Sequence, residues 1–582
     1  MNRTDHAVIG GLVLLLGLIA AGIGMPAFSP AAVSVTPSIP TPTQAADLPY
    51  REGTIGRPVS VNPLAARTQV DRDLVALTFS GLVKLGADGN LVPDLASRWT
   101  VDKTGKVWTF TIRADALWHD GEPLTASDVL FTVNILRDPT YSGPGAGSWR
   151  EVTPSVLDAH TIQFDLATPL GGFLQLATQP IAPAHLLDGI PIESLPDDPF
   201  GRRPVGSGSF SIVELDDQQA ILEPAGSAAQ PTSEPSGASP SAGELPSDAL
   251  ATPASTRRPT GALPLLPRIE FHFFDDAESL AAAFEAGDVD AASGLSAVDA
   301  AGLATRANGR LLRYPGTTMT TVLLNLRPVH PEFRDPRVRL ALLAALNRPA
   351  LIASAFGGFA TQADSLIPPT SWAFDPIASA RLDYDRKAAG KVLKDQGWTK
   401  VDGAWRLPKA KAPYVLQLVT PDAASNPVLH AVAERVAADW KALGIRVELV
   451  EAAPGTLYSD YLADGKFSTA VLDISIGHDP DLYPLLASSQ TQTGGLNVIG
   501  LQSAPLDALL AAARKPGEIA VRKAAYSALQ KQLTEGRFLF PIAFADEVVV
   551  VRDVVAGVVT QPVGDPSDRF WDVLTWRLAN GR

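Results

Sequence analysis

The sequence predicts a mixed α/β fold, and two stretches of the chain carry that prediction. Residues 106–113 alternate apolar and polar side chains, which is the period-2 pattern of a β-strand, and a helix is expected to follow from Thr125. Farther along, residues 426–443 have the pattern of a helix, Gly444 is its expected C-terminal residue, and residues 445–449 alternate as a strand. Strands and helices that alternate in this way are typical of α/β domains.

The first of these stretches predicts a strand, a turn and a capped helix. Trp108, Phe110 and Ile112 share one face of the expected strand. Thr125 is a suitable N-cap residue, and Asp128 stands three residues later, where a capping box places its second partner. The apolar stripe of the helix consists of Val129, Val133 and Leu136.

Composition excludes several classes of protein. The chain has 582 residues and a formal net charge of −14, which argues against nucleic-acid binding because that function needs basic patches. Ordinary solubility explains the acidic balance. The chain has no cysteine, so it has neither disulfides nor a thiol nucleophile nor a cysteine that could carry a lipid.

The N-terminus predicts a membrane-targeting segment. Residues 7–25 are uncharged and almost wholly apolar, and they are long enough to span a bilayer. We therefore expect residues 1–28 to be a signal peptide or a retained signal anchor, with the rest of the chain outside the cytoplasm, anchored to the cell membrane or secreted. Residues 29–48 are rich in Pro and Thr and are expected to form an extended tether.

A longer motif surrounds the predicted strand and helix. It consists of Trp99, Asp102, Gly105, Trp108 to Phe110, Ile112-Arg113, Trp118 to Gly121, Pro123 to Ala126, Asp128-Val129 and Phe131. In this order the residues resemble the signature of the peptide/nickel class of extracellular solute-binding proteins, family 5, which serve ABC importers. The resemblance implies a two-lobed clamshell of the periplasmic-binding-protein type (class II, cluster C), with a ligand between the lobes.

Other segments extend the resemblance over about residues 50–576. They are residues 51–54, 61–64, 204–214, 335–352, 385–398 and 538–544. The resemblance implies that lobe I comprises residues 49–315 and 548–582 and that lobe II comprises residues 316–547. The chain departs from the pattern at residues 224–264, which are rich in Pro, Ser, Ala and Thr and are expected to form a disordered insertion.

Motifs for catalysis, nucleotide binding and metal binding are missing from the sequence. The eight histidines show no HExxH or i, i+4 spacing, so a zinc site is not expected. No G-x-S-x-G or GxxxxGK[ST] pattern occurs, and the pair His119-Asp120 lies in a turn without a nucleophile motif. We therefore expect a binding protein without catalytic residues, metal or cofactor.

A binding cleft needs aromatic side chains and a few polar anchors. Our candidates are Asn62, Trp149, Trp372, His478, Asp479, Tyr483 and Asn497. Each has a structural alternative: turn formation for Asn62 and Asp479, packing for the two tryptophans, and an exposed helix surface for Tyr483. In peptide binders of the family, an Asp three residues before an acidic residue-Pro turn holds the peptide's α-amino group. Ile476 stands at that position here, unless Asp473 or Asp479 takes over the role.

The expected function is that of the solute-binding component of an ABC importer. It would bind a peptide or a related small solute and dock, as a monomer, on the transmembrane subunits of a permease. Closure of the lobes on the ligand would then be a shift of population and not a reaction. Two alternatives remain at this stage: a membrane-tethered sensor with the same clamshell, and a peptide hydrolase.

Overall fold

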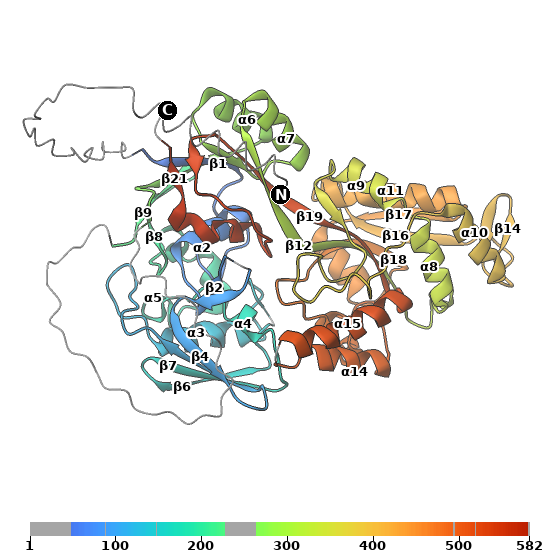
Figure 1. Ribbon diagram of the computed structural model, residues 1–582, viewed down its shortest axis with the longest axis horizontal. Coiled ribbons are helices and arrows are strands. Elements are labelled where there is room, and N and C mark those ends of the chain that lie inside the picture. Colours follow the sequence, from blue (N-terminus) through green and yellow to red (C-terminus); the bar gives the residue numbers. More distant parts are fainter. Residues whose placement is uncertain are drawn as a thin grey trace, which may run out of the picture. The chain divides into compact units, whose positions relative to one another are not determined.

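The structure is a computed structural model, and it describes most of the chain from Leu48 to Ala579 (Figure 1). The described ranges are residues 48–87, 89–146, 148–226, 264–492, 495–517 and 519–579. The predicted targeting segment, nearly all of the predicted tether and most of the predicted insertion at residues 224–264 therefore lie outside the described residues.

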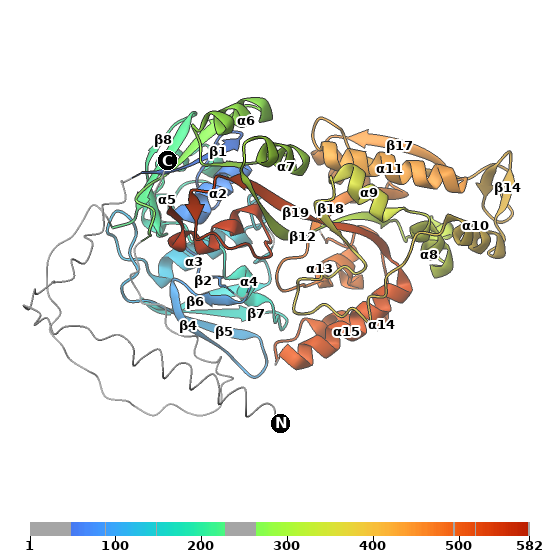
Figure 2. The same cartoon turned by 45° about the horizontal axis from the view of Figure 1, so that its top comes forward.

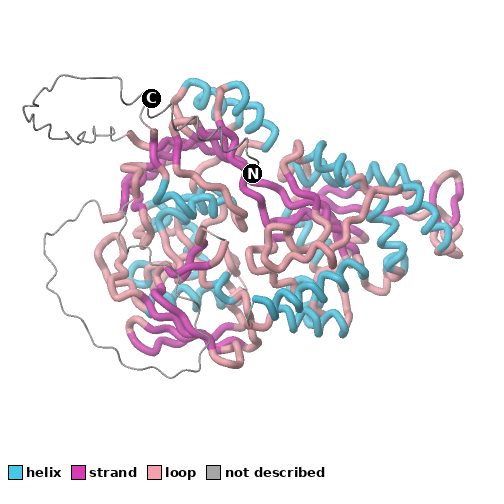
Figure 3. Tube along the Cα trace, viewed as in Figure 1, coloured by secondary structure: helices cyan, strands magenta, loops and turns pink. Residues whose placement is uncertain are grey.

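Within the described residues, eleven strands form one mixed sheet. In spatial order they are β17 (Arg446–Ala452), β16 (Val415–Pro421), β18 (Thr469–Ser475), β12 (Arg310–Leu324), β19 (Leu539–Val551), β11 (Ala291–Ser293), β1 (Tyr50–Ile55), β10 (Ile269–Phe274), β9 (Gln219–Pro224) and β8 (Phe210–Leu215), with β13 (Ala360–Gln362) on β19. The continuous path of strands is visible in Figure 3.

Two long antiparallel strands, β12 and β19, connect the two halves of this sheet (Figure 2). Their pairing runs from Arg310↔Val551 to Leu323↔Leu539, with irregular register between Pro315 and Met319. The resemblance to the family implies a crossing strand over residues 317–326, but β12 begins already at Arg310. Charged residues interrupt the apolar pattern at the start of β12, and pairing with β19 extends the strand there.

The buried hydrophobic residues form clusters that lie on one side or the other of the irregular region. Two clusters contain residues before Pro315 or after Glu547, and two contain residues between Met319 and Phe544. We call the first side lobe I (residues 49–315 and 548–579) and the second side lobe II (residues 316–547). Each lobe thus has its own core, and β12 and β19 link them.

Lobe I contains a second sheet, of four antiparallel strands, and the predicted strand and helix lie there. The strands are β4 (Ala96–Val101), β5 (Val107–Ile112), β7 (Thr161–Leu166) and β6 (Val152–Asp158), and the helix is α3 (Ala126–Arg137). The predicted capping box is confirmed: Thr125 N donates to Asp128 Oδ2 at 2.8 Å. Phe110 and Phe164 are fully buried and pack edge to face in the core beneath this sheet.

Lobe II carries helices on both faces of its strands. Helices α8 (Pro336–Ala344), α9 (Arg348–Ala355) and α11 (Pro427–Leu443) pack on one face, and α14 (Ala504–Ala513) and α15 (Ile519–Gly536) pack on the other. The predicted end of α11 is confirmed, since Gly444 has a φ of 105° and caps the helix. The strand expected after it is β17.

The remaining helices and short strands also belong to the two lobes. They are α2 (Gln69–Thr78), β2 (Val83–Leu85), β3 (Leu91–Pro93), α4 (Phe173–Leu176), α5 (Ala184–Leu187), η1 (Ile192–Asp197), η2 (Pro199–Arg202), α6 (Ala277–Ala286), α7 (Ala297–Arg306), η3 (Pro331–Phe333), α10 (Arg386–Asp395), β14 (Thr399–Val401), β15 (Ala404–Arg406), α12 (Pro454–Thr456), η4 (Leu457–Leu462), α13 (Tyr483–Leu486), η5 (Ser488–Thr491), β20 (Val555–Ala556), η6 (Pro566–Thr575) and β21 (Arg577–Leu578).

Two further observations concern these helices. The resemblance to the family implies one short helix within residues 174–187. The structure has the separate turns α4 and α5 instead, because Pro180 and Pro183 lack the N–H groups that a continuous helix needs. Of the helices in the described part of the chain, none is by itself both long and apolar enough to cross a membrane.

Candidate functional site

The turn after β18 brings charged and aromatic side chains between the two lobes. Ile476 N donates to Thr317 O on β12, so the turn leaves the sheet directly beside a crossing strand. Gly477 has a φ of 72°, a conformation that favours glycine, and it reverses the chain into residues 478–481. We call the segment Gly477-His478-Asp479-Pro480-Asp481 the Asp-Pro turn.

An arginine of α15 holds the first carboxylate of the Asp-Pro turn. Both terminal nitrogens of Arg522 bind Asp479, each at 2.6 Å, and the side chains are only 10% and 18% exposed. Bidentate pairs of this kind fix the geometry of both partners. The guanidinium also lies 4.7 Å from the centre of the Trp372 ring. Asp479 is therefore engaged within lobe II.

The second carboxylate of the turn has a similar partner. Arg514, which follows α14, binds Asp481 at 2.9 Å and lies 4.5 Å from the centre of the Tyr483 ring. Burial raises the pKa of Asp481, while Arg514 opposes that rise. Asp481 also accepts a hydrogen bond from the backbone N–H of Tyr483 at 3.1 Å. Both carboxylates of the Asp-Pro turn are thus paired with arginines.

Lobe I contacts the surroundings of the turn at two places. Gly171 N donates to Arg514 O at 2.6 Å, and His478 Nε2 lies 3.5 Å from Asp568 Oδ2 of η6. These contacts come from segments of lobe I that are far apart in the sequence. The Asp-Pro turn therefore lies where the two lobes meet.

Two cavities border this meeting place. The first has a volume of about 360 Å³ and is enclosed by α2, the hairpin β2–β3 and η6 of lobe I, with His478 of lobe II. The second has a volume of about 420 Å³ and has walls from both lobes. Its polar lining comprises Ser148, Arg150, Glu151 and Thr168 of lobe I, and Tyr483, Gln490, Gln492 and Arg514 of lobe II. Both volumes are in the range of small-molecule sites.

Four of the predicted site residues come together around the Asp-Pro turn. His478 lines the first cavity and Tyr483 lines the second. Asp479 and Trp372 share the guanidinium of Arg522. Whether any of these side chains contacts a solute stays a prediction.

The other three predicted residues are buried away from the turn. Asn62 accepts a hydrogen bond from Leu64 N at 2.9 Å within its own turn. Trp149 is 2% exposed and packs in an aromatic cluster with Phe164 and Phe173. Asn497 is 1% exposed and its amide ties its own loop together, for instance by donating to Leu501 O at 2.9 Å. These contacts lie within their own lobes, and a contact of any of the three side chains with a solute stays a prediction.

The position that would hold a peptide's amino group carries no free carboxylate. Ile476 is 8% exposed and belongs to the lobe II core. Asp479 is bound by both terminal nitrogens of Arg522. Asp473 accepts a hydrogen bond from Thr320 Oγ1 at 2.5 Å, and burial raises the pKa of its carboxyl.

Sequence reasoning missed three charged residues near this region. Arg514 ends α14 and Arg522 lies in α15. Arginine is common on helices, so no local sequence pattern distinguishes these two from surface arginines. Glu547 lies on β19 opposite Tyr314, and burial raises the pKa of its carboxyl to about 7. In the portion of the chain that the structure describes, no three His, Asp or Glu side chains converge as a metal-binding group.

Comparisons with known proteins identify the family of the chain. The family model described as "Bacterial extracellular solute-binding proteins, family 5 Middle" matches residues 90–495. The oligopeptide-binding protein AppA of Bacillus subtilis is 24% identical over 92% of this chain and 92% of its own length. The nickel-binding periplasmic protein of Escherichia coli is 24% identical over 88% of this chain and 92% of its own length.

Solved structures show the same fold. The structure of AppA from Bacillus subtilis with a nonapeptide covers 92% of this chain and 99% of its own, with a TM-score of 0.69 and 22% identity. HbpA2 from Haemophilus parasuis covers 91% of this chain and 100% of its own, with a TM-score of 0.72 and 19% identity. Because the family model matches more than half of the residues, the chain belongs to family 5 of the bacterial extracellular solute-binding proteins, which bind solutes and are not enzymes.

Proposed function

We propose that this protein is the solute-binding component of an ABC importer and that it holds a peptide or a related small solute between its lobes, beside the Asp-Pro turn. One observation carries the assignment of the site. The second cavity is lined by both lobes, so a solute in it would contact lobe I and lobe II at once. Such a solute stabilises the closed arrangement over an open one, which is what a binding protein of this kind needs.

Beside the charged side chains of Arg150, Glu151 and Arg514, the second cavity has neutral polar groups that suit a solute with amide groups. Tyr483, Gln490 and Gln492 supply neutral donors and acceptors, and Leu170 and Leu496 supply apolar contact. Relatives are described as oligopeptide-binding, dipeptide-binding and nickel-binding proteins. A peptide is therefore the solute class that the lining and the relatives support together.

The charges of the Asp-Pro turn restrict how such a solute is recognised. Asp479 and Asp481 are each neutralised by an arginine, and Ile476 is apolar. A solute with a free ammonium group would find no unpaired carboxylate at this turn. We therefore propose that recognition there uses hydrogen bonds to neutral groups and stacking on aromatic rings.

The remaining parts of the proposal concern the cell. The protein acts as a monomer outside the cytoplasm, held at the membrane by the N-terminal segment or secreted. It delivers the solute to the transmembrane subunits of an ABC permease. No observation favours the sensor alternative.

A thermal-shift screen tests the proposed site. The full chain is heated with a library of peptides of two to nine residues, and at least one peptide should raise the unfolding midpoint, because binding to the folded state alone stabilises it. Tyr483→Ala should lose most of that shift. Tyr458→Ala is the matched control, since Tyr458 is 45% exposed and lies outside both cavities. A shift that survives Tyr483→Ala in full would place the site elsewhere.

A further inference from the structure

The loop between α14 and α15 makes one of the contacts of lobe II with lobe I. Pro516 of this loop lies against the hairpin turn at Gly105, and Arg514 and Lys515 lie against Gly171, which precedes α4. The adjacent Gly172 lies against Asp479 of the Asp-Pro turn. Figure 2 shows the start of α15 beside the end of the hairpin formed by β4 and β5. The Gly171 N to Arg514 O hydrogen bond of 2.6 Å joins the two lobes directly.

Glycines on the lobe I side allow this approach. A Cβ atom on Gly171 would lie 2.9 Å from the guanidinium carbon of Arg522 and 3.0 Å from the carbonyl oxygen of Lys515. A Cβ on Gly172 would lie 3.2 Å from the carboxylate of Asp479, and one on Gly105 would lie 2.4 Å from the Pro516 ring. Any side chain at these positions would therefore hold the lobes farther apart.

The residues that touch lobe I are also the ones that hold the Asp-Pro turn. Arg514 offers its carbonyl to Gly171 and its guanidinium to Asp481. Arg522 lies against Gly171 and binds Asp479 with both terminal nitrogens. Separation of the lobes here removes packing from both arginines, so the turn and the interlobe contact are coupled physically.

The contact also forms part of the wall of the second cavity. Leu170 of lobe I and Arg514 of lobe II, which flank the 2.6 Å hydrogen bond, both line that cavity. The covalent connection between the lobes runs through β12 and β19, whereas the α14–α15 loop contributes non-covalent contacts that can break and form again. Loss of this contact would therefore remove part of the wall of the second cavity.

We propose that the contact of Gly171-Gly172 with the α14–α15 loop and with Asp479 is the closing contact of the binding cycle, with Arg522 as the positioning residue that couples it to the Asp-Pro turn. The claim that the closed form encloses the solute rests on the proposed function. The contact itself can be tested without any solute.

A disulfide formed across the contact provides that test, because the natural chain has no cysteine. Gly105→Cys and Pro516→Cys are introduced together in the full chain. The Cβ positions would be 3.2 Å apart, close to the separation of about 3.5–4.5 Å that disulfides have. Mild oxidation should form the bond, with two thiols losing two protons and two electrons to added oxidised glutathione. Its rate of formation measures how often the lobes close.

Two leucine variants in this background make the test specific. Gly171→Leu should slow disulfide formation at least tenfold, because the side chain meets Arg522 and Lys515. Gly517→Leu is the matched control, since it lies in the same loop with nothing within 4 Å of its Cβ position, and it should leave the rate unchanged. Equal rates in the two variants, or no disulfide in a folded protein, would overturn the proposal.

A second pair of cysteines covers the case in which the first pair does not fold, since Gly105 has a φ of 71°. Gly172→Cys and Asp479→Cys place Cβ atoms 3.5 Å apart across the same contact. Failure of this folded pair to form a disulfide would also overturn the proposal. If the disulfide forms but no peptide binds, the result supports the closing contact and contradicts the proposal that the solute is a peptide.

The role of Arg522 has its own readout. In the first cysteine pair, Arg522→Gln should slow disulfide formation about tenfold, and Arg522→Lys should recover part of the rate because it keeps the charge. A residue with a purely structural role would change the unfolding midpoint and leave the rate of closure as it is. An unchanged rate in a folded Arg522→Gln variant would remove Arg522 from the proposal.

Discussion

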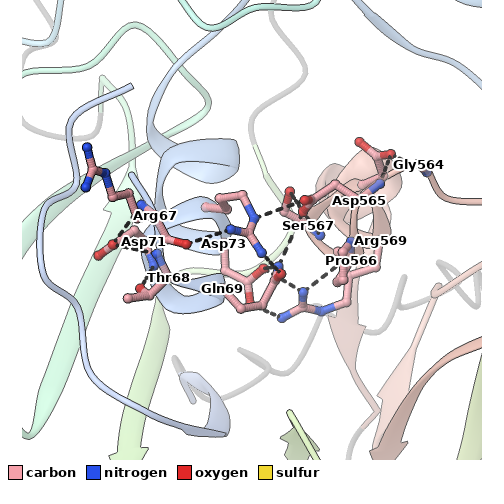
Figure 4. A network of polar contacts seen from close by, with 12 residues as sticks. Arg67, Thr68, Gln69, Asp71, Asp73, Gly564, Asp565, Pro566, Ser567 and Arg569 are labelled. Carbon is pink, nitrogen blue, oxygen red and sulfur yellow. Dashed lines mark hydrogen bonds and ion pairs between the residues drawn. The ribbon is translucent and has the colours of Figure 1, made fainter. Parts of the chain in front are cut away.

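Arg569 is a fully buried cation in the network that ties η6 to α2 (Figure 4). It is 2% exposed and binds Asp73 and Glu52, each at 2.7 Å. Burial raises the pKa of Asp73, and the guanidinium opposes that rise. One arginine thus compensates two buried carboxylates, and the C-terminal segment is held to the start of lobe I by this cluster.

Removal of Arg569 should be strongly destabilising. Arg569→Met would leave two buried carboxylates without their cation, and breaking a buried ion pair from one side costs about 3–5 kcal/mol. Urea unfolding measures the loss. Arg67→Met is the control, because its side chain is exposed and should change the free energy of unfolding by less than about 0.5 kcal/mol. Similar decreases in the free energy of unfolding for Arg569→Met and Arg67→Met would show that the buried cluster makes no net contribution to stability.

Glu547 should make the stability of the protein depend on pH. Burial raises the pKa of its carboxyl, Arg569 lowers it, and the nearby Asp73, Asp565 and Glu52 raise it, so that the pKa lies at about 7 and not at 4.5. The folded state therefore binds a proton that the unfolded state has lost between these two pH values. Stability falls as pH rises through that window, by about 3 kcal/mol in total.

Glu547→Gln should remove this pH dependence. At pH 8 the variant should be more stable than the natural protein by up to about 3 kcal/mol, and below pH 4.5 the two should be nearly equal, because the carboxyl is then neutral in both states. Urea unfolding at several pH values measures the difference. Glu535→Gln, at an exposed position, serves as the control. Parallel profiles for the Glu547 variant and the natural protein would contradict the assignment.

The sequence predicts some of the residues around the Asp-Pro turn and misses others. The sequence predicts His478 and Asp479 because they belong to a turn that resembles the acidic residue-Pro turn of the family, and Tyr483 because it follows that turn by two residues. Arg522 and Arg514 were not predicted, since an ion pair between a turn and a distant helix leaves no trace in local spacing. Tertiary contact alone determines which carboxylate is free and which is neutralised.

The helix α3 shows how local signals determine an element. Thr125 and Asp128 form a reciprocal capping box, and Asp128 also accepts a hydrogen bond from Ala184 N at 3.0 Å. Asp128 is 5% exposed, so its carboxylate satisfies donors that water does not reach. The cap therefore fixes both the start of α3 and the segment that leads into α5.

Loss of this cap should cost more than a typical helix cap. Asp128→Ala should destabilise the protein by about 2 kcal/mol, since it removes the cap and leaves the N–H of the half-buried Ala184 without its acceptor. Ser127→Ala, one residue away and exposed, should have little effect. Thermal unfolding of the two variants measures the difference. A loss below about 1 kcal/mol for Asp128→Ala would mean that Ala184 has found another acceptor.

Elements with strong local patterns were predicted well. Strand β5, helix α3 and the glycine end of α11 follow directly from alternation and caps. The early start of β12 and the division into α4 and α5 were not predicted. In the first case pairing with β19 outweighs an unfavourable composition, and in the second two prolines interrupt an otherwise suitable stretch.

The arrangement of the whole molecule could be predicted only through resemblance to a family. The motif around residues 91–138 indicates the fold because its residues occur together and in order. Nothing in it predicts that Gly171 meets the α14–α15 loop, since these segments are more than 300 residues apart in the sequence. The interlobe cavities likewise arise from the positions of both lobes together.

Native mass spectrometry of the full chain as purified tests the central claim, that the protein holds a solute between its lobes, most directly. The account predicts a population heavier than the chain by the mass of a peptide or another small solute, and denaturation should release that solute for identification. The same mass should be absent or greatly reduced after Tyr483→Ala. A protein that purifies empty, and that no peptide or small solute stabilises afterwards, would contradict the account.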